Sequence, residues 1–261
     1  MKIATWNVNS VKARLEHLIA WLKSEAPDVV LLQETKCVDE AFPREPIEDL
    51  GYNIAVYGQK SYNGVAILSK TPLEDVVMGL PTLPDDPQAR YIEALVGTVR
   101  VASIYVPNGG EIDSDKFDHK MRFYEALGRH AERLLALDEA LVWGGDYNVA
   151  PYPWDIHDPA LSGQERILCS VREQEALRSL FHLGLGDGLR LLYPQTSPQG
   201  QGLFSWWDYR QGSFERHKGF RIDHLLLSSH ACDRLREGGV DTQVRAWQRA
   251  SDHAPVWITL S

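Results

Sequence analysis

Residues 2–34, KIATWNVNSVKARLEHLIAWLKSEAPDVVLLQE, decide the fold. Two apolar runs, at 2–6 and 29–32, have the length and composition of buried strands. Between them, apolar residues recur at helical spacing, at Val11, Leu15, Leu18, Ile19 and Leu22. We expect this helix to have Ser10 as its N-cap and to end before Pro27. A helix between the two runs allows the strands to lie side by side, so that the residues after each strand meet at one edge.

Polar residues follow these strands and others along the chain. Such polar tips end five strand-like runs, at Trp6-Asn7-Val8-Asn9, Gln33-Glu34-Thr35, Asp146-Tyr147-Asn148, Arg221-Ile222-Asp223-His224 and Ser251-Asp252-His253. A charge that is withdrawn from water must be paired or must hold a metal. Strands that carry carboxylates, amides and a histidine at one end therefore predict a pocket, and the chain is expected to be an enzyme.

The remaining pattern mixes helices and strands without strict alternation. Hairpins are expected around Asn63-Gly64 and at Val99-Arg100, the latter joining antiparallel strands near 91–96 and 100–106. Long helices are expected at 115–137 and 171–183, and further strands at 141–143, 204–207, 222–227, 242–245 and 256–260. This order favours the α/β class, with a mixed sheet or two stacked sheets and helices outside. Because no linker is visible and both ends carry polar tips, we expect one domain over residues 1–261.

Three features of the sequence indicate the cellular compartment of the protein. We expect no secretory segment before the first strand, and no apolar run in the sequence approaches the length needed to span a bilayer. The three cysteines are far apart and lack a CxxC spacing, which favours reduced thiols. We therefore expect a cytoplasmic protein that does not bind membranes.

The formal net charge of −9 argues mildly against nucleic-acid binding, because Lys and Arg supply the affinity for phosphate backbones. Net charge averages over all faces, however, and an acidic metal site adds negative charge that a cation would neutralise. Basic residues also gather in loop-like segments, at Lys60, Lys70, Lys116, Lys120, Arg122, Arg210, Arg216, Lys218 and Arg221. The charge weakens the nucleic-acid interpretation without removing it.

Asn7 and Glu34 are the first candidate site residues. A lone Glu at a strand end is usually solvated, but Glu34 follows a buried run and lies beside a second polar tip. Their oxygens would suit a hard cation such as Mg²⁺. The sequence therefore predicts a metal site at this edge.

Asp146 and Asn148 follow two glycines. A Gly-Asp turn is common, but it needs only one small residue. The Asp-x-Asn spacing would place the carboxylate and the carboxamide on the same side of an extended segment. A carboxylate held by an amide can take a proton from water as a general base.

His253 lies in a third group, with Asp223 and Asp252. A lone histidine is more often structural, but two carboxylates near strand ends change that balance. A carboxylate bonded to one ring nitrogen favours the imidazolium and orients the other nitrogen toward an anionic oxygen. Tyr105 adds a phenol that could contact the same anion. Three aromatic residues are either core or the walls of a pocket for an extruded nucleotide: Trp206, Trp207 and Phe220.

Six motifs in family order resemble the bacterial exonuclease III family of the endonuclease/exonuclease/phosphatase fold. They are WNVNS (6–10), QETK (33–36), YVPNG (105–109), GDYNVAP (145–151), RIDH (221–224) and SDHAPV (251–256). The resemblance implies a four-layer α/β sandwich of two mixed sheets flanked by helices. It also implies a monomer that uses Mg²⁺ or Mn²⁺ to hydrolyse double-stranded DNA, cleaving 5′ to abasic sites and removing nucleotides in the 3′→5′ direction.

The same resemblance implies roles for individual residues. Glu34 would bind the metal with help from Asn7 and with Asp252 in or beside that shell. Asp146 would deprotonate the attacking water, which Asn148 orients. His253, supported by Asp223, would bind the scissile phosphate, and Tyr105 would contact it or assist the leaving group. Further substrate contacts are expected from Asn108, Trp206, Phe220, Ile222 and Arg90.

Two other interpretations remain open. A nucleic-acid-binding regulator of this fold without nuclease activity would have lost its carboxylates, yet Glu34, Asp146, Asp223 and Asp252 are present. A phosphoinositide or sphingomyelin hydrolase would keep the chemistry, but the DNA-family form of the motifs argues against it. We expect a DNA-repair nuclease.

Overall fold

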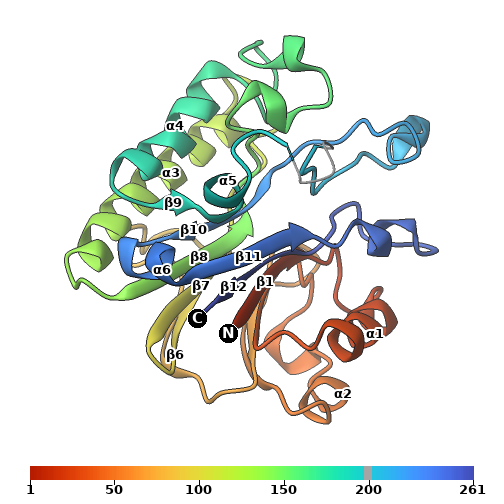
Figure 1. Cartoon of the computed structure of the whole chain (residues 1–261), viewed down its shortest axis with the longest axis vertical. Coiled ribbons are helices and arrows are strands. Elements are labelled where there is room, and N and C mark those ends of the chain that lie inside the picture. Colours follow the sequence, from red (N-terminus) through yellow and green to blue (C-terminus); the bar gives the residue numbers. More distant parts are fainter. Residues whose placement is uncertain (197–201) are drawn as a thin grey trace.

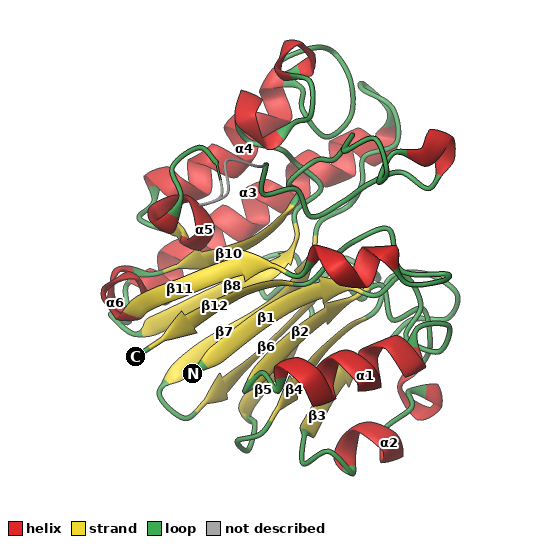
Figure 2. Ribbon diagram, turned by 45° about the vertical axis from the view of Figure 1, so that its right-hand side comes forward, coloured by secondary structure: helices red, strands yellow, loops and turns green. Residues whose placement is uncertain are grey.

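Two six-stranded sheets pack face to face, and helices cover both outer surfaces (Figures 1 and 2). The computed structural model describes residues 1–196 and 202–261. The first sheet has the order β11-β12-β1-β2-β4-β3 and the second β5-β6-β7-β8-β10-β9. This is the four-layer α/β sandwich that the resemblance implies.

The strands have the following bounds. The first sheet contains β1 (Lys2–Asn7), β2 (Val29–Gln33), β3 (Asn53–Tyr57), β4 (Val65–Ser69), β11 (Leu235–Val240) and β12 (Val256–Leu260). The second contains β5 (Glu74–Met78), β6 (Tyr91–Val96), β7 (Val99–Tyr105), β8 (Ala140–Asp146), β9 (Gly186–Asp187) and β10 (Asp223–Leu227). The α-helices are α1 (Leu15–Glu25), α2 (Glu45–Glu48), α3 (Asp115–Leu135), α4 (Val171–His182), α5 (Gly188–Leu192) and α6 (Ser229–Arg234).

Alternation along the strands divides the apolar residues between layers. In β1, Ile3 faces the second sheet and joins Leu31 and Val142 in the central core. Its neighbours Ala4 and Trp6 face the opposite way, toward α1. The outer face of the second sheet is covered by α3 and α4, through side chains such as Phe123, Leu127 and Leu177. The central strands β1, β2, β4 and β8 are therefore buried on both faces, which explains their continuous apolar runs in the sequence.

Several predicted elements are confirmed. β1 and β2 are parallel neighbours, and β3–β4 and β6–β7 are antiparallel hairpins. The helices expected at 115–137 and 171–183 are α3 and α4. β12 pairs antiparallel with β1, so the two ends of the chain lie in the same sheet.

The start of α1 differs from the prediction. Asn9 and Ser10 have positive φ, and the helix begins only at Leu15, so Ser10 is not its N-cap. The backbone N–H groups of Ser10 and Val11 instead bond to carbonyls just beyond β2, at 2.8 and 3.2 Å. These long-range bonds extend the β1–β2 pairing and delay the helix by about one turn.

Other local predictions were wrong. The turn between β6 and β7 is at Gly97-Thr98 rather than at Val99-Arg100. Residues Thr242–Ala246 form a 3₁₀ helix instead of a strand, and within 204–207 only Trp206 makes isolated bridges. β5 was missed because it is a mostly exposed edge strand whose apolar run is only three residues long, Val76 to Met78. Within the described residues, no helix combines the length and apolarity that a membrane span requires.

Candidate active site

The candidate residues meet at one edge of the sandwich, where strand ends from both sheets converge. Asn7 ends β1, Tyr105 ends β7, and Asp146 ends β8. Asp223 begins the antiparallel strand β10 and is the register partner of Asp146. Parallel pairing of β7 with β8 places Tyr105 opposite Asp146 on the other side. The sheet topology thus gathers residues that are more than 200 positions apart in the sequence.

Two glycines allow β8 to sit this close to its neighbours. A Cβ at Gly145 would lie 1.9 Å from the Ile104 carbonyl oxygen, and one at Gly144 would lie 2.5 Å from Leu31 in the facing sheet. At Gly145 the clash is with backbone and excludes a side chain, whereas at Gly144 the side chains of Leu31 and Leu225 would have to move. The pair of glycines before Asp146 is therefore a packing requirement of the site.

The acidic side of the site is joined by Asn7. Its side-chain nitrogen donates to Glu34 at 2.8 Å and to Asp146 at 2.9 Å. The Tyr105 hydroxyl donates to the same Glu34 oxygen at 2.9 Å, and Lys36 forms an ion pair with the other at 2.7 Å. Asn7 and Glu34 do meet as predicted. Asn7 presents its amide nitrogen to this cluster, however, because its oxygen accepts from the Asn9 backbone at 3.0 Å.

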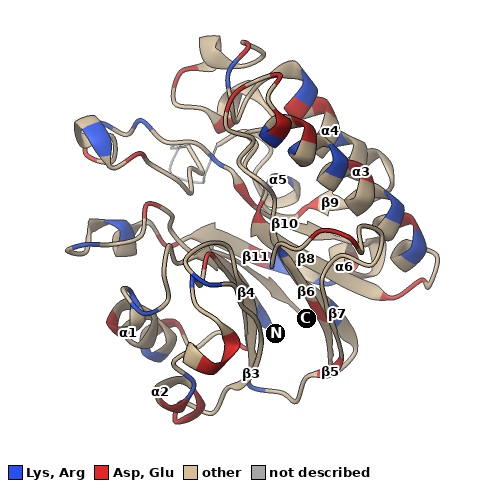
Figure 3. Cartoon of the chain, turned by 180° about the vertical axis from the view of Figure 1, so that it is seen from behind, with Lys and Arg blue, Asp and Glu red and all other residues tan. Residues whose placement is uncertain are grey.

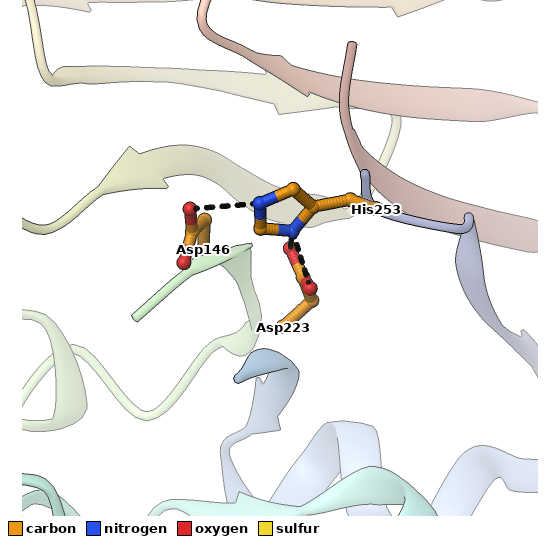
Figure 4. A group of neighbouring side chains, drawn as sticks. All are labelled: Asp146, Asp223 and His253. Carbon is orange, nitrogen blue, oxygen red and sulfur yellow. Dashed lines mark hydrogen bonds and ion pairs between the residues drawn. The ribbon is translucent and has the colours of Figure 1, made fainter. Parts of the chain in front are cut away.

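His253 forms the basic side of the site. Its Nδ1 bonds to the Asp223 carboxylate at 2.8 and 3.1 Å, and its Nε2 lies 3.7 Å from an Asp146 oxygen (Figure 4). Ser205 donates to Asp223 at 2.6 Å and fixes that carboxylate. Burial alone would lower the pKa of His253, but Asp223 and Asp146 raise the pKa to about 10. The ring is therefore an imidazolium near neutral pH.

Asp146 carries the opposite perturbation. Burial, aided by Asp223 and Glu34, raises the pKa of Asp146 to about 7, although His253 and the bond from Asn7 act against the increase. The backbone N–H of Asn148 holds its second oxygen at 2.9 Å. A buried carboxylate whose pKa lies near neutrality is suited to accept a proton from water.

Tyr105 remains a phenol rather than a phenolate. Burial and the adjacent Glu34 and Asp146 carboxylates raise the pKa of its hydroxyl well above the ordinary value. Arg90 lies over its ring, 4.6 Å from the centroid, and donates to its backbone carbonyl at 3.2 Å. Arg90 is thereby fixed next to Glu34 and Tyr105.

Negative charge is in excess at this edge. Among the described residues, the carboxylates of Glu34, Asp146, Asp223 and Asp252 outnumber the adjacent cations, which are His253, Lys36 and Arg90. Asp146, Asp223 and His253 offer donor atoms within 4.8 Å of one another, close enough to hold a metal ion. A protonated His253 cannot ligate, so the carboxylates are the better donors. Glu34 and Asp146, which share the Asn7 amide, fit a divalent cation by both charge and donor type.

Asp252 lies beside this cluster and is engaged elsewhere. Its two oxygens accept from Trp206 Nε1 at 3.0 Å and from Asn9 at 2.9 Å.

Trp206 meets Phe220 edge to face, with ring centroids 5.8 Å apart. Ile222 is 1% exposed and packs in the same small apolar cluster. The aromatic wall is therefore Trp206 and Phe220, with Ile222 behind it.

A pocket of about 260 Å³ lies next to Arg90 and Asn108. It is lined by Gln88, Arg90, Pro107, Asn108, Gly109, Gly110, Lys116 and His119. None of these described lining residues carries a carboxylate, although charges of both signs are spread over the outer helices and loops (Figure 3). This pocket suits an anion despite the net charge of −9.

Sequence reasoning missed some of these residues and misplaced others. Ser205 and His119 were not predicted, because an isolated serine or histidine has no motif of its own. Lys36 was within reach, since it completes the QETK motif. Lys120 and Arg221, expected among the basic loop residues, are both fully buried.

Comparisons with known proteins agree with this geometry. The model of the Endonuclease/Exonuclease/phosphatase family matches residues 4–253. Exodeoxyribonuclease III of Haemophilus influenzae is 35% identical over 268 residues, which cover 98% of each chain. A 3′ phosphatase from Neisseria, solved with a product DNA hairpin, is 40% identical with a TM-score of 0.95, over 100% of this chain and 99% of the other.

An AP endonuclease from Archaeoglobus fulgidus is 34% identical, with a TM-score of 0.94 over 100% of this chain and 99% of that chain. The likeness therefore extends over the whole sequence and through both sheets. The chain belongs to the Endonuclease/Exonuclease/phosphatase family and, within it, to the exonuclease III and AP endonuclease group.

Proposed function

We propose that this protein is a DNA-repair nuclease that hydrolyses phosphodiester bonds in double-stranded DNA, cleaving 5′ to abasic sites and acting on 3′ ends. One observation carries the proposal. Asp146, whose pKa is raised to about 7, lies 3.7 Å from the imidazolium of His253 at the edge where Glu34 also lies. A base and a cationic donor thus face the same space, as attack of water on a phosphorus centre requires.

Each residue around that space has a proposed task. Asp146 accepts the proton of the attacking water, and Asn148 orients that water. His253, held by Asp223, donates from Nε2 to a phosphate oxygen as negative charge develops. Tyr105 donates its hydroxyl hydrogen bond toward the phosphate or the leaving oxygen.

Glu34 is the proposed principal ligand of Mg²⁺ or Mn²⁺, with Asp146 nearest to it and Asp252 at the margin. Asn7 holds the two carboxylates together through its amide nitrogen. When bound, the ion neutralises negative charge on the phosphate and on the leaving oxygen.

Double-stranded DNA is the proposed substrate, with the abasic sugar or the 3′ terminus against Trp206 and Phe220. Arg90 and Asn108 contact adjoining phosphates, and Lys116 and His119 extend this contact along the 260 Å³ pocket. The similar Neisseria structure holds a DNA hairpin, which supports this class of substrate. We further propose that the enzyme acts as a cytoplasmic monomer whose residues 1–261 form one domain.

A comparison of two duplexes tests the proposal, one with an abasic site and one undamaged with a recessed 3′ end. Both should be cleaved with Mg²⁺ and neither with a chelator, and their ratio gives the balance of the two activities. Glu34→Gln should require a higher Mg²⁺ concentration for half-maximal rate. Cleavage that is insensitive to the chelator, or no cleavage of either duplex with Mg²⁺ or Mn²⁺, would overturn the assignment.

A further inference from the structure

Lys120 is a fully buried cation that the proposed chemistry does not use. It lies on α3 with none of its side chain exposed, and its ammonium group has three acceptors. One is Glu173, and the others are the backbone carbonyls of Asn148 at 2.8 Å and Asn108 at 3.1 Å. All three donors of the ammonium are therefore used.

Glu173 anchors this contact to α4. One of its oxygens accepts from the Leu168 backbone at 3.1 Å as well as from Lys120. The other accepts from the backbone and hydroxyl of Ser170, at 3.0 and 2.7 Å, within the capping box of α4. Lys120 thus connects two helices to the loops that follow β7 and β8.

Those two loops carry neighbouring site amides. Asn108 donates from its side chain to the Asn148 side-chain oxygen at 3.1 Å, and Asn148 donates to the Val106 carbonyl at 3.0 Å. Asn148 has a left-handed backbone, with φ of 51°, while its N–H holds Asp146 at 2.9 Å. Such a conformation persists only where surrounding contacts impose it. The ammonium supplies one of these contacts, at the Asn148 carbonyl.

We propose that Lys120, held by Glu173, is a positioning residue that sets the Asn108 and Asn148 amides against Asp146 and the scissile phosphate. The inference rests on the proposed function, because it gives these amides a role in catalysis. Lys120 itself does not touch the substrate.

Stability alone does not require an ion pair here. A buried ion pair loses its hydration, and well-packed apolar residues of the same volume are often as stable. Burial lowers the pKa of Lys120 even though Glu173 opposes that shift, so the charge is costly to keep. An apolar pair, however, would leave the Asn108 and Asn148 carbonyls without this donor, and both belong to the site.

Lys120→Met tests the inference because it keeps an unbranched side chain only one atom shorter and removes the charge. We expect kcat on the abasic duplex to fall about 10- to 100-fold with a small change in KM, as a misplaced site group would cause. In the Asn148→Ala background, the same substitution should cost less than about threefold, because residues that act through each other are not additive. Glu173→Gln should shift kcat in the same direction by less.

Leu127→Ala is the matched control, since Leu127 is a buried residue of α3 in the outer core. It should lower stability, and any loss of activity should be the same with and without Asn148. Equal losses for Lys120→Met in both backgrounds would show that Lys120 is merely structural.

Amide hydrogen exchange gives a result that does not depend on nuclease activity. In Lys120→Met, and in Glu173→Gln if the first variant does not fold, exchange should accelerate in residues 106–110 and 147–149 but not in β7 or β8. Unchanged exchange in both loops overturns the inference even if the enzyme is active. If the wild-type protein cleaves no DNA, accelerated exchange in these loops still supports the positioning contact, while the proposed function fails.

Discussion

Two buried ionic clusters lie side by side at β10, and they differ in charge balance. In the Arg221 cluster, Arg221 and Arg190 face two carboxylates, those of Asp155 and Asp187. Arg221 bonds to both oxygens of each carboxylate, at 2.7 to 3.1 Å. The fifth member of the Arg221 cluster is His224, which is neutral because burial and then Arg221 lower the pKa of its ring to about 4.

The Asp146 cluster is made of four carboxylates, those of Glu34, Asp146, Asp223 and Asp252, and three cations, His253, Lys36 and Arg90, so its carboxylates outnumber its cations. In the Arg221 cluster each carboxylate is paired with an arginine. Burial would raise the pKa of Asp187, but Arg221 outweighs burial and lowers that pKa below its ordinary value. At Asp146 burial, together with the charges of Asp223 and Glu34, outweighs the effect of His253 and raises the pKa to about 7. Burial and charge are common to both clusters, so charge balance separates a structural cluster from a site that can take up a proton and a metal.

The largest expected effect comes from Asp146→Asn. Removing the proposed base should lower Mg²⁺-dependent cleavage of the abasic duplex by on the order of 10³-fold, while DNA binding remains measurable. Single-turnover kinetics measure the cleavage rate, and a separate titration measures the affinity for DNA. Full activity in this variant would remove Asp146 from its role.

Arg221→Met should instead act on stability. It leaves Asp155 and Asp187 buried with one fewer cation, and breaking a buried pair in this way costs about 3–5 kcal/mol. Urea unfolding at pH 7.5 measures the change. A variant that is as stable as the wild type but inactive would contradict the structural role of this cluster.

The pH dependence of stability should distinguish the clusters by sign. The pKa of His253 is raised from 6.5 to about 10, so its stabilising contribution is complete below pH 6.5 and is lost as the pH rises through 10. The pKa of Asp187 is lowered, so its contribution is present above its ordinary value of 3.8 and is lost on acidification.

Unfolding free energies from pH 3 to 10 test this difference. Asp223→Asn should flatten the alkaline decline, because Asp223 is the first of the groups that raise the pKa of His253. An unchanged alkaline slope in Asp223→Asn would show that the imidazolium is not held by that carboxylate.

The smallest effect concerns the stability of the metal-free enzyme at pH 8. Ionised Asp146 is unfavourable there, since the pKa is raised from 3.8 to about 7. Asp146→Asn should therefore stabilise the protein by about 1 kcal/mol at pH 8, and this gain should vanish at pH 3. The matched variant Asp187→Asn should be destabilising at pH 8. Thermal unfolding in the presence of a chelator measures the stability of both variants. If both substitutions stabilised the protein, or both destabilised it, the proposed difference between the two clusters would be wrong.

Much of the fold was predictable because its signals are local. Apolar runs marked β1, β2 and β8, and helical spacing marked α3 and α4. The prediction was wrong where long-range hydrogen bonds form. Ser10, for example, does not cap a helix, because its backbone N–H donates to the backbone carbonyl of Glu34. The mostly exposed edge strand β5 has too short an apolar run, Val76 to Met78, to predict a strand.

The candidate site shows the same division. Polar tips after strands predicted that Glu34, Asp146, Asp223 and His253 would converge, since strand ends share an edge. The sequence could not show that Asn7 turns its nitrogen toward two carboxylates, or that Asp252 is engaged by Trp206. Side-chain orientation depends on neighbours that are distant in sequence.

By itself, the sequence determined the layered architecture and the chemical groups of the site, because periodicity and motif spelling are properties of consecutive residues. Only the tertiary structure decided which charges are paired, which are left in excess, and that Lys120 and Arg221 are buried. The reason is physical: desolvation and Coulomb energies depend on distances through space, and these join residues as far apart as Asp146 and His253.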